Sequence, residues 1–206
     1  MTRIYLIRHA EASGNTAQRF HGHFDSDLTP KGRLQLERLG DRFKNIVIDA
    51  AYSSDLKRAY ETARAVVGDR GIDIIRDREL REIDGGEWED LEWSEIFENR
   101  KEEFESFNAA PDVVNIPGGE NATELQTRIK NRIFDIVKAH PGASVCVTSH
   151  AIAIKTFLCY VHNIPIRDMG FRVWCKNTAV TAMDISPDGR VKLLRENDVS
   201  HLIGME

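Results

Sequence analysis

Cysteine is scarce in this chain of 206 residues, and long hydrophobic runs are missing. The three cysteines, Cys146, Cys159 and Cys175, are widely spaced and form no C-x-x-C pair, which argues against a disulfide framework or a zinc knuckle. No segment approaches the roughly 18 consecutive apolar residues that a membrane-spanning helix needs. We therefore expect neither a disulfide-stabilised domain nor a protein that spans or binds a membrane.

An excess of basic residues is also missing. The chain has 28 Lys and Arg residues against 33 Asp and Glu residues, which gives a formal net charge of -5, and 41% of its residues are hydrophobic. Such a composition is typical of a globular protein, and the acidic balance gives no general reason to bind nucleic acid. The length fits one domain, so we expect a single domain over residues 1–206.

The N-terminal segment does not resemble a secretory signal. Arg8 and His9 interrupt the first apolar run too early for the hydrophobic region of a signal peptide. Together with the composition, this predicts a cytoplasmic enzyme or binding protein.

Short apolar runs alternate with amphipathic segments along the chain. Strands are predicted at residues 4–7, 50–52, 72–75, 144–148, 178–185 and 191–194. Helices are predicted at residues 30–43, 56–66, 91–107, 120–139 and 151–160. Strands that alternate with helices indicate an α/β fold, here a three-layer α/β/α sandwich with a mostly parallel central sheet.

Cationic and imidazole side chains follow three of the predicted strands. Arg8 and His9 come directly after the first strand, Arg58 lies in the first turn after the second, and His150 follows the strand at 144–148. Ligands of open α/β sheets bind at the carboxyl ends of the strands, so we expect these side chains at one edge. Two guanidinium groups and two imidazoles, with backbone N–H groups at helix N-termini, would bind a small anion such as a phosphate group.

Each of these residues also has an ordinary structural interpretation. A single histidine at a strand end usually serves packing, and Arg58 has Asp55 and Glu61 at ion-pairing spacing along its own helix. Their joint occurrence at three strand ends favours a shared site. Glu82, which precedes a glycine-rich turn, is a candidate proton donor beside such a site, and its other interpretation is an ordinary loop carboxylate.

Six ordered motifs resemble the signatures of the histidine phosphatase superfamily, also called the phosphoglycerate mutase-like family. They are Leu6-Ile7-Arg8-His9-Ala10-Glu11 with Asn15, the segment 20–32, Ser53-Ser54-Asp55-Leu56-Lys57-Arg58-Ala59, the segment 80–88, Pro117-Gly118-Gly119-Glu120, and Thr148-Ser149-His150-Ala151. The resemblance covers nearly the whole chain. It implies that family's fold and a two-step phosphoryl transfer without a metal or another cofactor.

The resemblance also implies a role for each catalytic residue. His9 would be the nucleophile that attacks phosphorus and forms a phosphohistidine, with a backbone carbonyl fixing the tautomer of its imidazole. Arg8, Arg58 and His150 would hold the phosphoryl oxygens. Glu82 would give a proton to the leaving alcohol and later take one from water.

The substrate site implied by the resemblance contains Asn15, His21, Gly22 and Ala151. Ala12 lacks the hydroxyl that the family usually has there, His21 stands where glutamine is frequent, and Ala151 stands where glycine is common. His21 and His23 suggest a metal as an alternative, but no carboxylate or cysteine lies at ligand spacing, so we expect no metal.

The segment at about 83–117 is predicted to act as a lid. It is rich in Trp, Phe and Glu, and Arg100-Lys101 is its main basic pair, whereas the family's true mutases carry a longer and more basic insertion here. This favours a phosphatase that acts on small, partly apolar phosphorylated metabolites. A cofactor-dependent phosphoglycerate mutase and a non-catalytic phosphate-binding scaffold are the alternatives, and the aromatics could also simply pack into the core. A monomer or homodimer is expected.

Overall fold

A single six-stranded sheet organises the computed structural model, which describes residues 1–205. The sheet has the order β3-β2-β4-β1-β5-β6. Its strands are β1 (Thr2–Arg8), β2 (Ala50–Ser54), β3 (Ile74–Asp77), β4 (Ser144–Ser149), β5 (Val180–Ile185) and β6 (Val191–Asp198). The first four are parallel to one another, and β5 and β6 join as antiparallel strands. The predicted, mostly parallel sheet is confirmed, although β3 begins at Ile74 rather than at residue 72.

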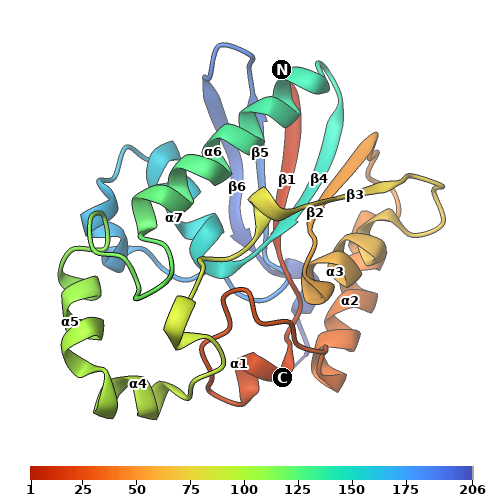
Figure 1. Cartoon of the computed structure of the whole chain (residues 1–206). Helices are drawn as coiled ribbons and strands as arrows, with labels where there is room; N and C mark the ends of the chain where they lie inside the picture. Colours follow the sequence, from red (N-terminus) through yellow and green to blue (C-terminus); the bar gives the residue numbers. More distant parts are fainter. Residues whose placement is uncertain (206) are drawn as a thin grey trace.

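Helices cover both faces of this sheet (Figure 1). The larger ones are α2 (Pro30–Phe43), α3 (Lys57–Val67), α6 (Ala122–Ala139) and α7 (Ala151–Val161). Strand alternation explains the two layers, because successive side chains point to opposite faces. Leu6 belongs to the core shared with Ile133 and Phe157 of α6 and α7, whereas Ile7 packs with Phe43 of α2 and Val66 of α3. The predicted three-layer α/β/α sandwich is confirmed.

Local sequence sets where the long helices begin. Thr29 caps α2, its Oγ1 accepting a hydrogen bond from the Gly32 N–H at 2.9 Å, and Pro30 occupies the first helical position. Asn121 caps α6 through a reciprocal pair of hydrogen bonds with Glu124. No helix within residues 1–205 combines the length and the apolar character that crossing a membrane requires.

The single helix predicted over residues 91–107 is wrong, because two helices occupy this segment. They are α4 (Trp93–Asn99) and α5 (Lys101–Ala109), and Arg100 between them leaves the helical region with φ -127° and ψ 30°. The ring centroids of Phe97 and Phe104 are 4.9 Å apart. Residues seven positions apart in a straight helix rise by about 10.5 Å, so only a break lets these rings meet.

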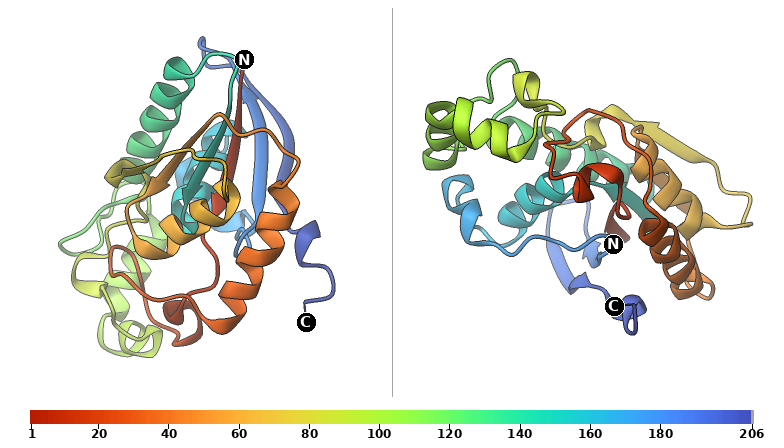
Figure 2. Two further views of the ribbon diagram at one scale, coloured as in Figure 1. Left: turned by 90° about the vertical axis from the view of Figure 1, so that its right-hand side faces the viewer. Right: turned by 90° about the horizontal axis from the view of Figure 1, so that it is seen from below.

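The short elements lie mainly around the carboxyl edge of the sheet. They are α1 (Ser13–Thr16) and the 3₁₀ helices η1 (Arg78–Leu80), η2 (Gly86–Trp88), η3 (Ile166–Phe171) and η4 (Ser200–Leu202). Seen from below in Figure 2, α1 lies centrally, α4 and α5 lie to one side of it, and α2 and α3 lie to the other. The loops that carry the candidate site residues therefore meet between these helices.

Candidate active site

Neighbouring parallel strands bring the catalytic candidates to one place. Arg8, the last residue of β1, is in register with Ser149, the last residue of β4. His9 and His150 follow directly, and their ring centroids are 5.1 Å apart. Arg58 comes from the first turn of α3, which follows β2 on the other side of β4. The structure thus gathers side chains that are far apart in the sequence.

His9 is buried and held in one tautomer. Its side chain is 4% exposed, and Nδ1 lies 2.7 Å from the backbone carbonyl of Ala10. Since a carbonyl only accepts hydrogen bonds, Nδ1 carries the proton and Nε2 keeps its lone pair. Burial, and then the charges of Arg58 and Arg8, hold the pKa of His9 well below its usual range. The imidazole is therefore neutral and nucleophilic near neutral pH.

Arg58 is a buried cation held mainly by backbone carbonyls. Its side chain is 2% exposed and donates to the carbonyl oxygens of Phe24 at 2.7 Å and Gly22 at 2.8 Å. The nearest carboxylate, that of Asp25, lies 3.9 Å away. Burial lowers the pKa of Arg58, but an arginine stays charged in proteins. Its positive charge is thus available to an anion.

The carboxylates considered as partners of Arg58 contact other cations. Asp55 accepts two hydrogen bonds from Arg81 at 2.6 and 2.7 Å, and the Glu61 carboxylate lies 3.4 Å from Arg64. The interpretation of Arg58 as a member of a helix-surface ion pair is therefore wrong.

Buried polar atoms without partners gather beside His9. Among residues 1–205, Arg8 Nε, His150 Nδ1 and His21 Nδ1 are buried and make no hydrogen bond. The rest of Arg8 is anchored, with Nη1 donating to the Cys175 carbonyl at 2.7 Å. Buried polar groups in native proteins are nearly always paired, so unpaired nitrogen atoms mark a place for an anionic ligand.

His150 is oriented by a serine that sequence reasoning did not identify as part of the site. Its Nε2 lies 2.8 Å from Ser54 Oγ, and burial followed by the charge of Arg58 holds the pKa of His150 well below its usual range. The Ser54 hydroxyl can donate to Nε2, which leaves the proton on Nδ1, the nitrogen without a partner. Ser54 stands inside the motif at residues 53–59, but no separate role in the site was expected for it.

Glu82 lies at the N-terminus of α7. Its buried carboxylate accepts hydrogen bonds from the backbone N–H groups of Ile152 and Ala153, both at 2.9 Å, and of Ile83 at 3.1 Å. These three backbone donors fix the position of the Glu82 side chain at the start of α7. The expectation that these N–H groups face a phosphate is therefore wrong for Ile152 and Ala153, since both bind Glu82.

The predicted substrate residues lie around this cluster. Asn15 Oδ1 accepts from the Ala12 N–H at 3.0 Å, and the buried Gly22 supplies a carbonyl to Arg58. A Cβ atom at Gly22 would come within 2.2 Å of the Ile83 carbonyl, so only glycine fits. Ala151 begins α7 and is buried.

The two loop histidines have different partners. His21 Nε2 lies 3.1 Å from Asp90 Oδ1, whereas His23 Nε2 lies 3.0 Å from the Glu82 carbonyl. In the part of the chain that the structure describes, no group of three or more His, Cys, Asp or Glu side chains is arranged to hold a metal ion.

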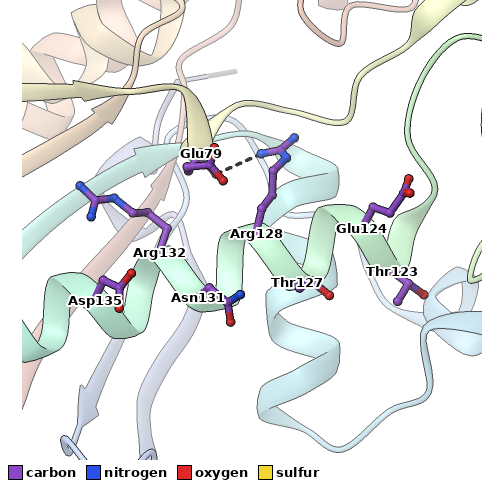
Figure 3. A pocket seen from close by; sticks show the side chains of 8 residues that line it. All are labelled: Glu79, Thr123, Glu124, Thr127, Arg128, Asn131, Arg132 and Asp135. Atoms are coloured by element: carbon purple, nitrogen blue, oxygen red, sulfur yellow. Dashed lines mark hydrogen bonds between the residues drawn. The ribbon is translucent and has the colours of Figure 1, made fainter.

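Arg128 of α6 fixes the chain on both sides of Glu82, and Figure 3 shows its contact with Glu79. Its guanidinium donates to the backbone carbonyls of Glu79, Arg81 and Glu82 at 3.0, 2.9 and 2.6 Å. It also binds the Glu120 carboxylate at 2.7 and 2.8 Å, and that carboxylate accepts the Asp84 N–H at 3.0 Å. Sequence reasoning missed Arg128, because its position within a helix gives no sign of a contact with a distant loop.

An aromatic pocket of about 420 Å³ adjoins the cluster. Its main aromatic residues are Phe20, Trp88, Trp93, Phe104, Phe107 and Trp174. Ile152, whose backbone N–H binds Glu82, also lines the pocket and connects the two places. Within the segment 83–117, Trp88 and Ile96 are buried in the core, Phe104 and Phe107 pack against that core, and all of these except Ile96 also line the pocket. The alternative that the aromatics pack into the core is thus confirmed in part, and the lid stays a prediction.

A neutral imidazole, one buried and one half-buried guanidinium group and a held carboxyl group at the carboxyl edge of a parallel sheet define a class of α/β proteins that handle phosphoryl groups. The chain belongs to the histidine phosphatase superfamily (branch 1), whose family model matches residues 4–198. The family predicted from the motifs is thereby confirmed.

Individual relatives match along nearly the whole chain. Phosphoserine phosphatase 1 of Hydrogenobacter thermophilus is 28% identical over 202 residues, which cover 98% of this chain and 95% of that protein. Phosphoglycerate mutase-like protein 4 of Arabidopsis thaliana is 32% identical over 202 residues, with coverages of 97% and 86%. The structure of YhfR from Bacillus stearothermophilus superposes with a TM-score of 0.93 at 34% identity, with coverages of 98% and 100%.

Proposed function

We propose that this protein is a phosphatase that hydrolyses small phosphomonoesters through a phosphohistidine on His9. The observation that carries the proposal is the free Nε2 of a neutral His9 beside the unpaired Arg8 Nε and His150 Nδ1. These groups would hold a phosphoryl group by its oxygens while the imidazole faces phosphorus. The phosphatase relative from Hydrogenobacter supports the same class of reaction.

In the first step, His9 Nε2 attacks phosphorus and the bond from phosphorus to the ester oxygen breaks. Glu82 gives its proton to that oxygen, which leaves as an alcohol. Arg8, Arg58 and His150 stabilise the charge on the transferring group. In the second step, water attacks the phosphohistidine and loses a proton to the Glu82 carboxylate, which releases inorganic phosphate and restores His9.

The charges of the lid-like segment favour a phosphatase over a mutase. Arg100 pairs with Glu87 at 2.8 Å and lies 3.3 Å from Glu103, and Lys101 lies 3.7 Å from Glu105. The predicted basic pair is thus neutralised by its own neighbours and offers little to a second phosphate group. We propose that α4 and α5 form the lid, with their aromatic side chains toward the leaving group.

A panel of phosphomonoesters in the presence of EDTA tests the function. We expect phosphate release from several small esters, phosphoserine and 3-phosphoglycerate among those assayed, at a rate that EDTA leaves unchanged. A parallel assay with 2,3-bisphosphoglycerate measures conversion of 3-phosphoglycerate to 2-phosphoglycerate. Fast conversion would favour the mutase, and phosphate binding without turnover of any ester would favour the scaffold.

Arg128→Met is expected to impair catalysis by loosening the chain around Glu82. We expect kcat for an alkyl phosphate to fall about tenfold, a fraction of the full effect of a general acid, with a smaller loss for p-nitrophenyl phosphate. Steady-state kinetics on both esters and titration with inorganic phosphate measure the effect, and phosphate affinity should stay unchanged.

Arg132→Met is the matched control for Arg128→Met. Arg132 lies one helical turn further along α6, lines the same surface pocket as Arg128 and Glu79 (Figure 3), and pairs with Asp77. The Arg132→Met variant should leave the ratio of kcat for the alkyl phosphate to kcat for p-nitrophenyl phosphate unchanged. Equal losses on both esters in Arg128→Met would show that Arg128 contributes to stability alone.

Three further expectations stay predictions. They are the cytoplasmic location, the single domain over residues 1–206 and the monomeric or homodimeric state.

A further inference from the structure

The aromatic pocket beside Glu82 contains a buried cation that the proposed reaction does not use. Lys155 lines this pocket and is 4% exposed. Among residues 1–205 it has neither an ion pair nor a side-chain hydrogen bond, whereas Arg167, the other cation of the pocket, lies 3.4 Å from Asp112. Its Nζ is not one of the fully buried unpaired atoms, so the ammonium can be reached from the pocket while no carboxylate in the described part of the chain offsets its charge.

Within residues 1–205, the Lys155 ammonium lies against an aromatic ring. Its Nζ lies 4.3 Å from the centroid of Trp174, which is itself 52% exposed. A cation–π contact at a partly exposed ring contributes modestly and leaves the ammonium hydrogens free to donate. Burial lowers the pKa of Lys155, with the charge of Arg172 acting in the same direction. A bound anion would offset both effects.

The position of Lys155 relative to Glu82 gives the direction of a bound substrate. Ile152 and Lys155 are three residues apart on α7, so both lie on the pocket side of the helix. The Ile152 N–H binds the carboxylate that would protonate the leaving oxygen. A leaving group that starts at Glu82 therefore runs along α7 through an apolar space and meets the ammonium about one turn further on.

We propose that Lys155 is a specificity residue that binds a carboxylate at the far end of the leaving group. The substrate class is then a phosphate ester of an alcohol or phenol with an apolar or aromatic body and a terminal carboxylate. The aromatic lining of the pocket contacts the apolar body of the leaving group, and Lys155 binds its carboxylate. The histidine and arginine cluster binds the phosphoryl group. A volume of about 420 Å³ is within the range of small-molecule sites. This assignment rests on the proposed phosphatase function.

A pair of substrates that differ by one charge tests the assignment. The pair is 3-(4-phosphonooxyphenyl)propanoate and its methyl ester, in which the aryl leaving groups are nearly identical. With the wild-type enzyme we expect kcat/KM for the acid to exceed that for the methyl ester by about tenfold, mainly through KM, as a charged hydrogen bond provides. In Lys155→Met the ratio should fall to about one, and Lys155→Arg should keep most of it.

Arg167→Met serves as the matched control, because it removes the pocket cation that already has a carboxylate partner. It should leave the ratio of the two substrates unchanged. An equal rate for acid and methyl ester in the wild-type enzyme, or an unchanged ratio in Lys155→Met, would overturn the role of Lys155 while leaving the phosphatase intact. Failure of the wild-type enzyme to hydrolyse any ester of the wider panel would instead overturn the function on which the assignment rests.

Discussion

A His9→Ala variant is expected to lose hydrolysis of every phosphomonoester by about 10,000-fold or more, as removal of a catalytic nucleophile does. The free nitrogen of His9 would attack phosphorus, and the proposed reaction has no second nucleophile that could replace it. Single-turnover labelling provides the direct measurement. The wild-type protein should acquire an acid-labile phosphoryl group that His9→Ala does not acquire.

A surface histidine is the matched control for this variant. His162 lies at the end of α7 and contacts Glu196 at 2.6 Å, so His162→Gln should retain wild-type rates. Phosphate release that persists in His9→Ala would show that another residue is the nucleophile.

The dependence of the rate on pH adds a check on His9. Burial and two arginines lower the pKa of His9, so its imidazole stays neutral as the pH falls through about 6.5, where a free imidazole gains a proton. Protonation of His9 should therefore cause no loss of rate near pH about 6.5.

Glu82→Gln is expected to slow the hydrolysis of alkyl phosphates by about 100- to 10,000-fold, the usual contribution of a general acid. The loss for p-nitrophenyl phosphate should be far smaller, because nitrophenolate leaves without needing a proton. Measured values of kcat/KM for esters of graded leaving-group acidity would show this as a steeper dependence in the variant. An equal loss on all esters would contradict the role of Glu82 as a proton donor.

The amide in Glu82→Gln also disturbs structure, since one carboxylate oxygen that accepts from a backbone N–H is replaced by an NH₂ group. Glu89 provides a matched control, because its carboxylate likewise accepts from three backbone N–H groups, those of His23, Phe24 and Gly85. Glu89→Gln therefore reproduces the structural cost. Only Glu82→Gln should change the dependence of rate on the leaving group.

The fold was predictable from the sequence wherever a local pattern decided the structure. The apolar run of β1 and the Thr29-Pro30 start of α2 both lie where expected, since strand burial and helix capping depend on neighbouring residues. The break at Arg100 was not predictable, because it depends on how Phe97 and Phe104 pack against each other. Such a contact follows from tertiary packing, which periodicity does not contain.

The candidate site was predictable where residues lie at strand ends or in motifs. His9 and His150 come together because β1 and β4 are adjacent, which follows from the family's fold rather than from either segment alone. A backbone carbonyl beside His9 was expected and is that of Ala10, whereas Ser54, which orients His150, was missed. Arg128 and Lys155 are charged residues on helices, and only the packed structure shows that one binds the Glu82 loop while the other lies buried in the aromatic pocket.

The unpaired nitrogen atoms of Arg8 and His150 have a consequence for how fast the protein works in a mixture. Inorganic phosphate presents the same oxygens as a phosphate ester, so the groups that would bind the substrate would also retain the product. Phosphate that accumulates during hydrolysis would then occupy the site and slow further turnover. The rate of hydrolysis would then depend on the ratio of ester to inorganic phosphate in solution, and it would fall as the product accumulates.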